Sequence, residues 1–211
     1  MTLVRYPERL KQNILPLSKS PLIHIAIGEW AFANSVIDAG NRTKCCELCD
    51  QERLRYQFLI KNGVNNNEMW VGSSCILKFG VAVMHGGKAL YGDQAKHVLE
   101  AQLQSKRKEI SLEALSTLLT KPNVNLKLVD GVKEFTEKGR ALSPKQISYV
   151  AWQLGKHGLN HDLAYFRMDL MKKKYQEDFA SLQDWQITQI WPALKPGQKK
   201  VAENNGYIAP K

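Results

Sequence analysis

The sequence predicts an α+β protein: a small module with a β-hairpin in residues 1–85, followed by a mostly α-helical domain in residues 86–211. Two observations lead to this prediction. Residues 54–73 hold two β-rich segments around a run of turn-forming residues, which is typical of a hairpin. Residues 88–211 instead carry apolar positions at helical spacing, interrupted by glycines and prolines that end helices. Gly86-Gly87 marks the expected boundary.

The elements are expected in a definite order along the chain. Residues 1–44 form an irregular lead-in, in which residues 22–27 are a short buried strand or a helical turn. The hairpin strands follow, and Ser73 or Ser74 caps a helix that starts near Cys75. Ser143-Pro144-Lys145-Gln146 predicts a capping box with proline in the first helical position. We expect the strands at 55–60 and 69–72, and helices at 89–109, 112–119, 130–138, 144–157, 161–176, 182–190 and 197–203.

Composition limits the class of protein. Apolar residues make up 44% of the 211 residues, which is enough for a hydrophobic core, so the chain is not disordered as a whole. The net charge is +10, which favours a polyanionic partner. Residues 81–211 carry 20 basic and 13 acidic residues, and are therefore the more basic part.

The pattern of apolar residues predicts a cytoplasmic protein without membrane contact. No stretch approaches the ~20 apolar residues of a membrane span. The first 17 residues hold charged side chains and lack the apolar middle of a signal peptide. In the cytoplasm, four cysteines within 31 residues indicate metal ligands or free thiols rather than disulfides.

The cysteines predict a zinc site. Cys46-Glu47-Leu48-Cys49 has the spacing at which two thiolates converge on one metal ion, and Cys75 is expected at a helix start, where the helix dipole stabilises a thiolate. A C-x-x-C turn, a hairpin and a third cysteine on a helix form the layout of a treble-clef zinc finger. Asp50 follows the turn where Gly is common, and it tolerates the left-handed conformation better than most residues.

A closed zinc site needs a fourth ligand, and the sequence offers three candidates. His24 ranks first, because a strand could fold back over the module. Cys45 is adjacent to Cys46, and His85 lies beyond Gly80, which could break the helix after Cys75. The alternative for His24 is an ordinary buried histidine, and the alternative for the whole cluster is a set of inert buried thiols.

The order of these motifs resembles a known pattern. Cys46-Glu47-Leu48-Cys49, residues 54–58 (LRYQF) and residues 71–76 (VGSSCI) are similar to a zinc-finger-like motif in uncharacterised phage and mobile-element proteins. The spacing of Trp30, Phe32 and Asn34 also resembles that pattern. The likeness covers roughly residues 28–80. It implies a zinc module and no assigned chemistry, and some such sequences carry Cys where this chain has Ser73.

We expect the protein to bind nucleic acid, DNA ahead of RNA, without catalysis and without a small-molecule substrate. Basic side chains would contact phosphates, and exposed aromatic rings would stack on bases. The candidates are Arg53, Arg55, Tyr56, Lys61, Trp70 and Lys78 in the module, and Lys106, Arg107, Lys108, Lys172, Lys173 and Lys174 beyond it. Lysines at helix ends are also ordinary solvated residues. Trp152, Trp185 and Trp191 are expected in the core.

Two other functions fit less well. A protein-interaction module, binding a host factor or a defence enzyme, would use zinc only for its shape. A treble-clef nuclease needs histidines at the hairpin, and residues 54–73 contain none. His157 and His161 have a metal-capable spacing, but Gly158 and Asn160 interrupt that helix. The sequence also lacks a phosphate-binding glycine loop followed by Lys-Ser/Thr.

Overall fold

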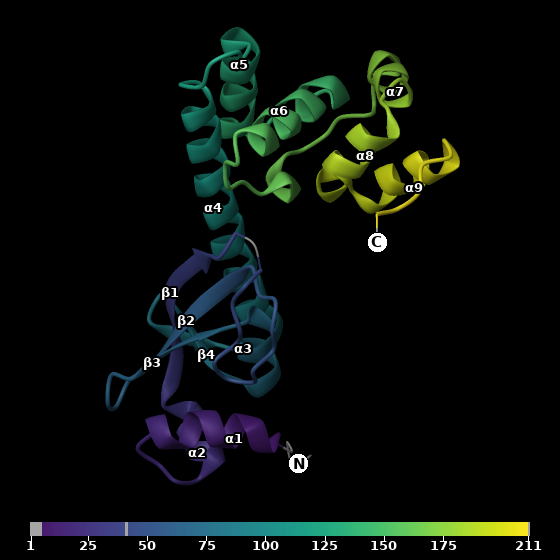
Figure 1. Ribbon diagram of the computed structural model, residues 1–211. Helices are drawn as coiled ribbons and strands as arrows, with labels where there is room; N and C mark the ends of the chain where they lie inside the picture. Colours follow the sequence, from purple (N-terminus) through teal and green to yellow (C-terminus); the bar gives the residue numbers. More distant parts are fainter. Residues whose placement is uncertain (1–5, 41, 211) are drawn as a thin grey trace. The chain divides into compact units, whose positions relative to one another are not determined.

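The computed structural model describes residues 6–40 and 42–210 and confirms an α+β protein (Figure 1). The chain forms two compact units, residues 1–106 and 107–211, here called unit 1 and unit 2. The division falls at 106/107 rather than at the predicted 85/86. The reason is that strands after residue 81 extend the sheet of unit 1, and Ala95 and Leu99 belong to its core.

Unit 1 is built on a five-stranded sheet in the order β3-β2-β1-β4-β5. Neighbouring strands are antiparallel except β1 and β4, which are parallel. The elements of unit 1 are α1 (Glu8–Ile14), a 3-10 turn (Leu15–Leu17), α2 (Ile23–Gly28), β1 (Trp30–Asp38), β2 (Tyr56–Asn62), β3 (Glu68–Val71), α3 (Ser73–Phe79), β4 (Ala82–His85) and β5 (Lys88–Leu90). The predicted hairpin is therefore confirmed as β2–β3. Residues 22–27 take the helical alternative, and the lead-in is more regular than predicted.

The tip of the hairpin is tied to the lead-in by asparagine side chains. The side-chain amides of Asn65 and Asn67 each donate to the carbonyl of Leu17, at 2.9 Å. Asn62 donates to the carboxylate of Glu29 at 2.7 Å, and Glu29 also accepts the backbone N–H groups of Lys19 and Ser20. These bonds lower the pKa of Glu29, with the Asn62 bond as the largest cause. The tip is consequently held by the chain before β1.

The core of unit 1 lies between the sheet and its helices. Trp30, Phe32, Phe58 and Ile60 are almost fully buried, and the rings of Phe32 and Phe58 lie 5.7 Å apart. Ile76 brings α3 into the same cluster. Burial of large apolar side chains contributes about 1.5–3 kcal/mol each, so most of the stability of this core comes from residues other than Cys46 and Cys75, which it also includes.

Unit 2 is helical and also takes up the end of α4. Its elements are α4 (Gly92–Leu118, which begins in unit 1), α5 (Leu126–Glu137), α6 (Pro144–Lys156), a 3-10 turn (Leu163–Tyr165), α7 (Lys173–Ala180), α8 (Asp184–Ile190), a 3-10 turn (Trp191–Ala193) and α9 (Pro196–Asn204). One helix replaces the two predicted over 89–119. The capping box at Ser143 is confirmed: its hydroxyl accepts from the N–H of Gln146, and its own N–H donates to the Gln146 side chain.

The helix predicted over residues 161–176 is wrong. Within this range a 3-10 turn forms at Leu163–Tyr165, the chain then runs extended, and only the last four residues are helical, as the start of α7 at Lys173. The backbone explains the difference, because Leu142 donates to the carbonyl of Arg167 and accepts from the N–H of Asp169. These pairings hold the segment in a β-type bridge, which a continuous helix could not make.

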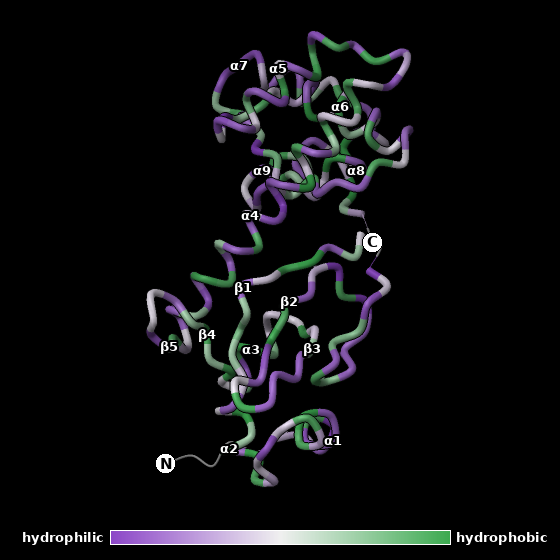
Figure 2. Tube along the Cα trace, turned by 90° about the vertical axis from the view of Figure 1, so that its left-hand side faces the viewer, coloured by the Kyte–Doolittle hydropathy of each residue, from purple (hydrophilic) through white to green (hydrophobic). Residues whose placement is uncertain are grey.

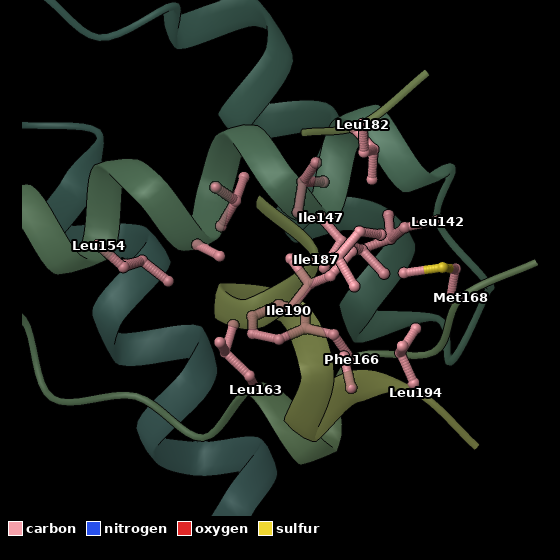
Figure 3. Packing of buried hydrophobic residues seen from close by; sticks show 14 of the residues in the cluster. Leu142, Ile147, Leu154, Leu163, Phe166, Met168, Leu182, Ile187, Ile190 and Leu194 are labelled. Carbon is pink, nitrogen blue, oxygen red and sulfur yellow. The ribbon is translucent and has the colours of Figure 1, made fainter. Parts of the chain in front are cut away.

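The core of unit 2 gathers residues from every helix after α4. Figure 3 shows Ile147, Ile187, Ile190 and Phe166 pointing toward one another, and all four are buried. Trp191 packs against this core as predicted. The prediction was wrong for Trp152 and Trp185, which are 40% and 50% exposed. The helices of unit 2 carry both hydrophobic and hydrophilic stretches in Figure 2. Within residues 6–40 and 42–210, none of the helices has the length and apolar character needed to cross a lipid bilayer.

Candidate metal centre

Cys46 and Cys49 lie in a turn, here called the cysteine turn (residues 44–54). A bridge between Lys44 and Leu54 closes its base. Inside it, the N–H of Asp50 donates to the carbonyl of Cys46 at 2.7 Å, and the N–H of Cys46 donates to the carbonyl of Gln51 at 2.9 Å. Asp50 has a φ of +58°, which is the left-handed conformation expected for the residue after Cys49. The turn therefore has the backbone that brings two cysteines to one side.

Asp50 stays in this conformation with help from α1. Its carboxylate accepts from the side chain of Asn13 at 3.2 Å and pairs with the guanidinium of Arg9. Left-handed backbone costs a residue with a Cβ roughly 1–2 kcal/mol. The contacts with α1 offset part of that cost and fasten the cysteine turn to the lead-in. Sequence reasoning missed both partners.

Cys75 comes from the start of α3. The helix begins after Gly72, which is the N-cap and makes no side-chain cap bond. The prediction that Ser73 or Ser74 caps this helix is therefore wrong. The N–H of Gly72 donates to the Sγ of Cys46 at 3.4 Å. Backbone N–H groups around sulfur stabilise a thiolate. The strand end, helix start and cysteine turn thus meet at the sulfur atoms.

Three sulfur atoms converge at this point. The Sγ of Cys75 lies 3.1 Å from that of Cys49 and 3.6 Å from that of Cys46, and all three lie within 4.8 Å of one another. Cys46 and Cys75 are buried, whereas Cys49 is half-buried. A metal ion with bonds of about 2.3 Å to sulfur separates tetrahedral ligands by about 3.8 Å. The distance from Cys75 to Cys46 is close to this value and the distance to Cys49 is shorter, so the three cysteines can hold a metal once the Cys49 and Cys75 sulfur atoms move apart.

The electrostatics favour a thiolate at one of the three. A hydrogen bond with Cys75 and the N–H groups of Gly72, Leu48 and Cys49 lower the pKa of Cys46 to about 5, although burial acts in the opposite direction. The pKa of Cys75 is raised, because it shares hydrogen bonds with Cys46 and Cys49 and is buried. Cys46 is therefore more easily ionised than Cys75.

The three predicted candidates for a fourth ligand lie outside this group. Among the described residues the group consists of Cys46, Cys49 and Cys75 alone. His24 is exposed on α2, Cys45 is exposed beside the turn, and His85 is exposed at the end of β4. The structure thus brings three of the four predicted ligands together and leaves His24 apart.

The predicted nucleic-acid-binding residues of unit 1 differ in their exposure and in whether a neighbouring acidic side chain neutralises them. Arg53 and Lys78 are exposed. Arg55 forms an ion pair with Asp38, whose side chain is 2% exposed, and its guanidinium also lies 5.3 Å from the ring of Tyr56. Asp38 thus neutralises the charge of Arg55. Lys61 lies 3.5 Å from Glu68 on the neighbouring strand. Tyr56, Trp70 and Lys106 are half-buried.

The candidates in unit 2 divide in the same way. Arg107 pairs with the buried carboxylate of Asp162 at 2.9 Å, and Lys108 donates to the carbonyl of Glu137 at 3.3 Å. These two side chains hold unit 2 together. The lysine run (Lys172–Lys174) lies exposed at the start of α7. Within it, Lys172 lies over the ring of Tyr175 and Lys173 lies 4.0 Å from Glu177.

Comparison of the chain with protein-family models, curated proteins and solved structures gives no match.

Proposed function

We propose that the protein is a zinc-stabilised, basic nucleic-acid-binding protein that acts without catalysis. The observation that supports it most is the convergence of the Cys46, Cys49 and Cys75 sulfur atoms. Thiolates are soft ligands, and a tetrahedral set of sulfurs is typical of Zn²⁺. The order of cysteine turn, β2–β3 hairpin and α3 agrees with a treble clef, the same order on which the likeness to phage and mobile-element proteins rests.

Metal would stabilise a part of unit 1 that has little regular secondary structure of its own. The cysteine turn lies in a long connection between β1 and β2, and its described residues form no strand longer than a single bridge. Structural zinc contributes apparent binding free energies of about 10–16 kcal/mol. Such an ion would fix the turn against the start of α3 and keep the exposed Arg53 in place.

Charge supports a polyanionic partner, and we place DNA ahead of RNA. The chain carries a net charge of +10, and phosphate contacts by Lys and Arg release counterions from nucleic acid. The exposed candidates are Arg53, Lys78 and the lysine run. Arg55 and Arg107 are poorer candidates, because Asp38 and Asp162 neutralise them.

Salt-dependent binding to single- and double-stranded oligonucleotides tests this proposal. Each phosphate contact on duplex DNA adds about −0.9 to the slope of log affinity against log salt, so substituting all three residues of the lysine run by Gln reduces the slope by about 2.7. A matched control substitutes Lys121, Lys127 and Lys133 by Gln, which changes the net charge equally. Equal losses in both variants would mean that net charge alone drives binding, and salt-insensitive binding would contradict the proposal.

A specific observation favours a second function, protein interaction. Unit 2 exposes apolar side chains that its core does not use: Met171 is 90% exposed, Ile208 88% and Trp185 50%. Exposed apolar groups of this size are typical of protein contacts when they form a patch. If the folded protein binds none of the oligonucleotides at low salt, a protein partner becomes the better explanation.

A further inference from the structure

The candidate metal centre has three protein donors, whereas tetrahedral zinc takes four ligands. Among the described residues, only Cys46, Cys49 and Cys75 bring a His, Cys, Asp or Glu ligand atom to it. The undescribed positions, residues 1–5, 41 and 211, are Met, Thr, Leu, Val, Arg, Asn and Lys. They add none of these four residue types. The chain in this conformation therefore leaves one coordination position unfilled.

Cys45, the nearest further thiol in sequence, is held away from the centre. Its carbonyl accepts a hydrogen bond of 2.8 Å from the side chain of Gln57, a residue that is 3% exposed. The N–H of the following residue, Cys46, is bonded to the carbonyl of Gln51. Both bonds fix the peptide after Cys45, and the N–H of Leu54 fixes the peptide before it by donating to the carbonyl of Lys44 at 2.8 Å. Cys45 is exposed in this position. Turning it inward would break these bonds.

Two of the three acidic residues of the cysteine turn, Glu47 and Asp50, are engaged elsewhere, and the third, Glu52, is exposed and lies outside the group of ligand atoms. The carboxylate of Glu47 accepts the N–H of Trp70 at 2.6 Å. The carboxylate of Asp50 is bonded to Arg9 and Asn13. Neither group is placed to take a proton from a metal-bound water, as a general base would. An unfilled position here suits ligand binding better than water activation.

Solvent reaches this group of cysteines at Cys49. Cys46 and Cys75 are buried, and Cys49 is the half-buried member of the set. A ligand from outside can reach the ion only where the surrounding side chains leave access. Because the other three ligands are thiolates, the ion is one that accepts soft donors.

We propose that the metal ion held by Cys46, Cys49 and Cys75 keeps an exchangeable fourth position, filled by water and replaced by a thiolate from outside the chain. This inference rests on the metal binding proposed above. Two sources share this chemistry: a low-molecular-weight thiol, or the exposed Cys45 of a second copy of the chain. Either one completes a four-sulfur site.

Cobalt(II) substitution distinguishes these cases, since its visible bands move to longer wavelength as sulfur replaces oxygen or nitrogen. We expect the full chain in thiol-free buffer at low concentration to show three sulfurs and one oxygen. Added 2-mercaptoethanol then raises the charge-transfer absorbance in proportion to the change from three cobalt–sulfur bonds to four. If a second copy of the chain supplies the thiolate, the wild-type protein should form a dimer and show the four-sulfur spectrum when it is concentrated. Cys45→Ser should then show neither.

Other outcomes would overturn the inference while leaving metal binding intact. A four-sulfur spectrum in the dilute monomer, lost in Cys45→Ser, would make Cys45 an internal ligand. A spectrum that indicates one nitrogen ligand, and that changes in His24→Ala or His85→Ala, would mean that a histidine is the fourth ligand. A spectrum that does not respond to added thiol would mean that the position is inaccessible. If cobalt gives no charge-transfer band at all, the metal centre itself is refuted.

Discussion

Replacing Cys49 by serine is the sharpest test of the metal centre. Cys46 is fully buried and accepts the N–H of Gly72, so changing it would disturb the fold as well as the site. Cys75 is 5% exposed inside α3. Cys49 is half-buried and its Sγ lies 3.1 Å from that of Cys75. Serine at this position keeps its size and leaves the hydroxyl near solvent.

The expected loss follows from the energy of zinc binding. An apparent binding free energy of about 10–16 kcal/mol, shared among three thiolates, gives each one roughly 3–5 kcal/mol. Cys49→Ser should therefore weaken zinc affinity by about 10²- to 10⁴-fold. The metal-free variant should lose much less, about 0.5 kcal/mol of unfolding free energy, since the change is small and lies near the surface.

The assay is competition for zinc against a chromogenic chelator, together with metal content by mass spectrometry on protein purified without chelator or a histidine tag. Cys45→Ser is the matched control, because that cysteine is adjacent in sequence and exposed. We expect about one zinc per chain in the wild type and in the control. Thermal unfolding with and without chelator should then separate the wild type from Cys49→Ser.

Equal zinc affinity in Cys49→Ser and the wild type would refute the reasoning. In that case the three sulfurs would be packed thiols, and the nucleic-acid proposal would rest on charge alone. If Cys45→Ser loses as much zinc as Cys49→Ser, Cys45 is itself a ligand and the three-cysteine site is wrong.

Three further predictions concern pH, the core of unit 2 and a helix cap. Because the pKa of Cys46 is lowered and that of Cys75 is raised, zinc has to displace the proton of Cys75, so its affinity should rise by at least about tenfold per pH unit around neutral pH; an affinity that does not change with pH would contradict this. Ile190 is fully buried, so Ile190→Ala should lower the unfolding free energy measured by chemical denaturation by about 2–5 kcal/mol. Zinc content should not change, and a loss of zinc would contradict the division of the chain into two separate cores. Ser143→Ala should cost about 1 kcal/mol and Ser143→Thr less, measured by thermal unfolding; equal stability of all three proteins would mean that the cap contributes nothing.

The sequence predicted the elements whose cause is local. The capping box depends on Ser143 and Gln146, which are three residues apart, and both of its hydrogen bonds form. The β2–β3 hairpin depends on two β-rich segments and the turn between them. The convergence of the three cysteines follows from that hairpin, because it returns the chain to the cysteine turn. Each of these features could be found within a short window of sequence.

What the sequence missed depends on partners far away in the chain. β1 lacks a clean alternation of apolar and polar residues, because its register shifts between Phe32 and Val36, where Asn34 has a φ of +55°. β4 pairs in parallel with β1 across a separation of about 50 residues. The bridge of Leu142 to residues 167–169 likewise displaced a predicted helix. Local propensity cannot detect such pairings.

The candidate binding residues show the same limit on a smaller scale. Arg55 resembles any surface arginine in sequence, but it pairs with Asp38, 17 residues before it on the neighbouring strand. Arg107 pairs with Asp162, 55 residues later. Charge counts treat both as available to phosphate. Among its described contacts the lysine run has no buried acidic partner of this kind. Its charges are therefore less neutralised by the protein, and it is the better candidate for binding phosphate.

Unit 1 is stabilised by its hydrophobic core and, in our proposal, by the metal ion, and the effect of removing the metal follows from which parts each of them holds. Trp30, Phe32, Phe58 and Ile60 bury a core of which Cys46 and Cys75 are only a small part, so the sheet should remain folded without metal. The cysteine turn has no strand pairing beyond a single bridge, and it is held by the burial of Leu48, by the bonds between Glu47 and Trp70 and by the contacts of Asp50 with α1. Chelation should therefore increase hydrogen exchange in residues 44–54 and at the start of α3, while β2 and unit 2 stay protected. Because loss of zinc loosens this part without unfolding the sheet, a parallel loss of nucleic-acid affinity would locate the contact near Arg53, and unchanged affinity would locate it in unit 2.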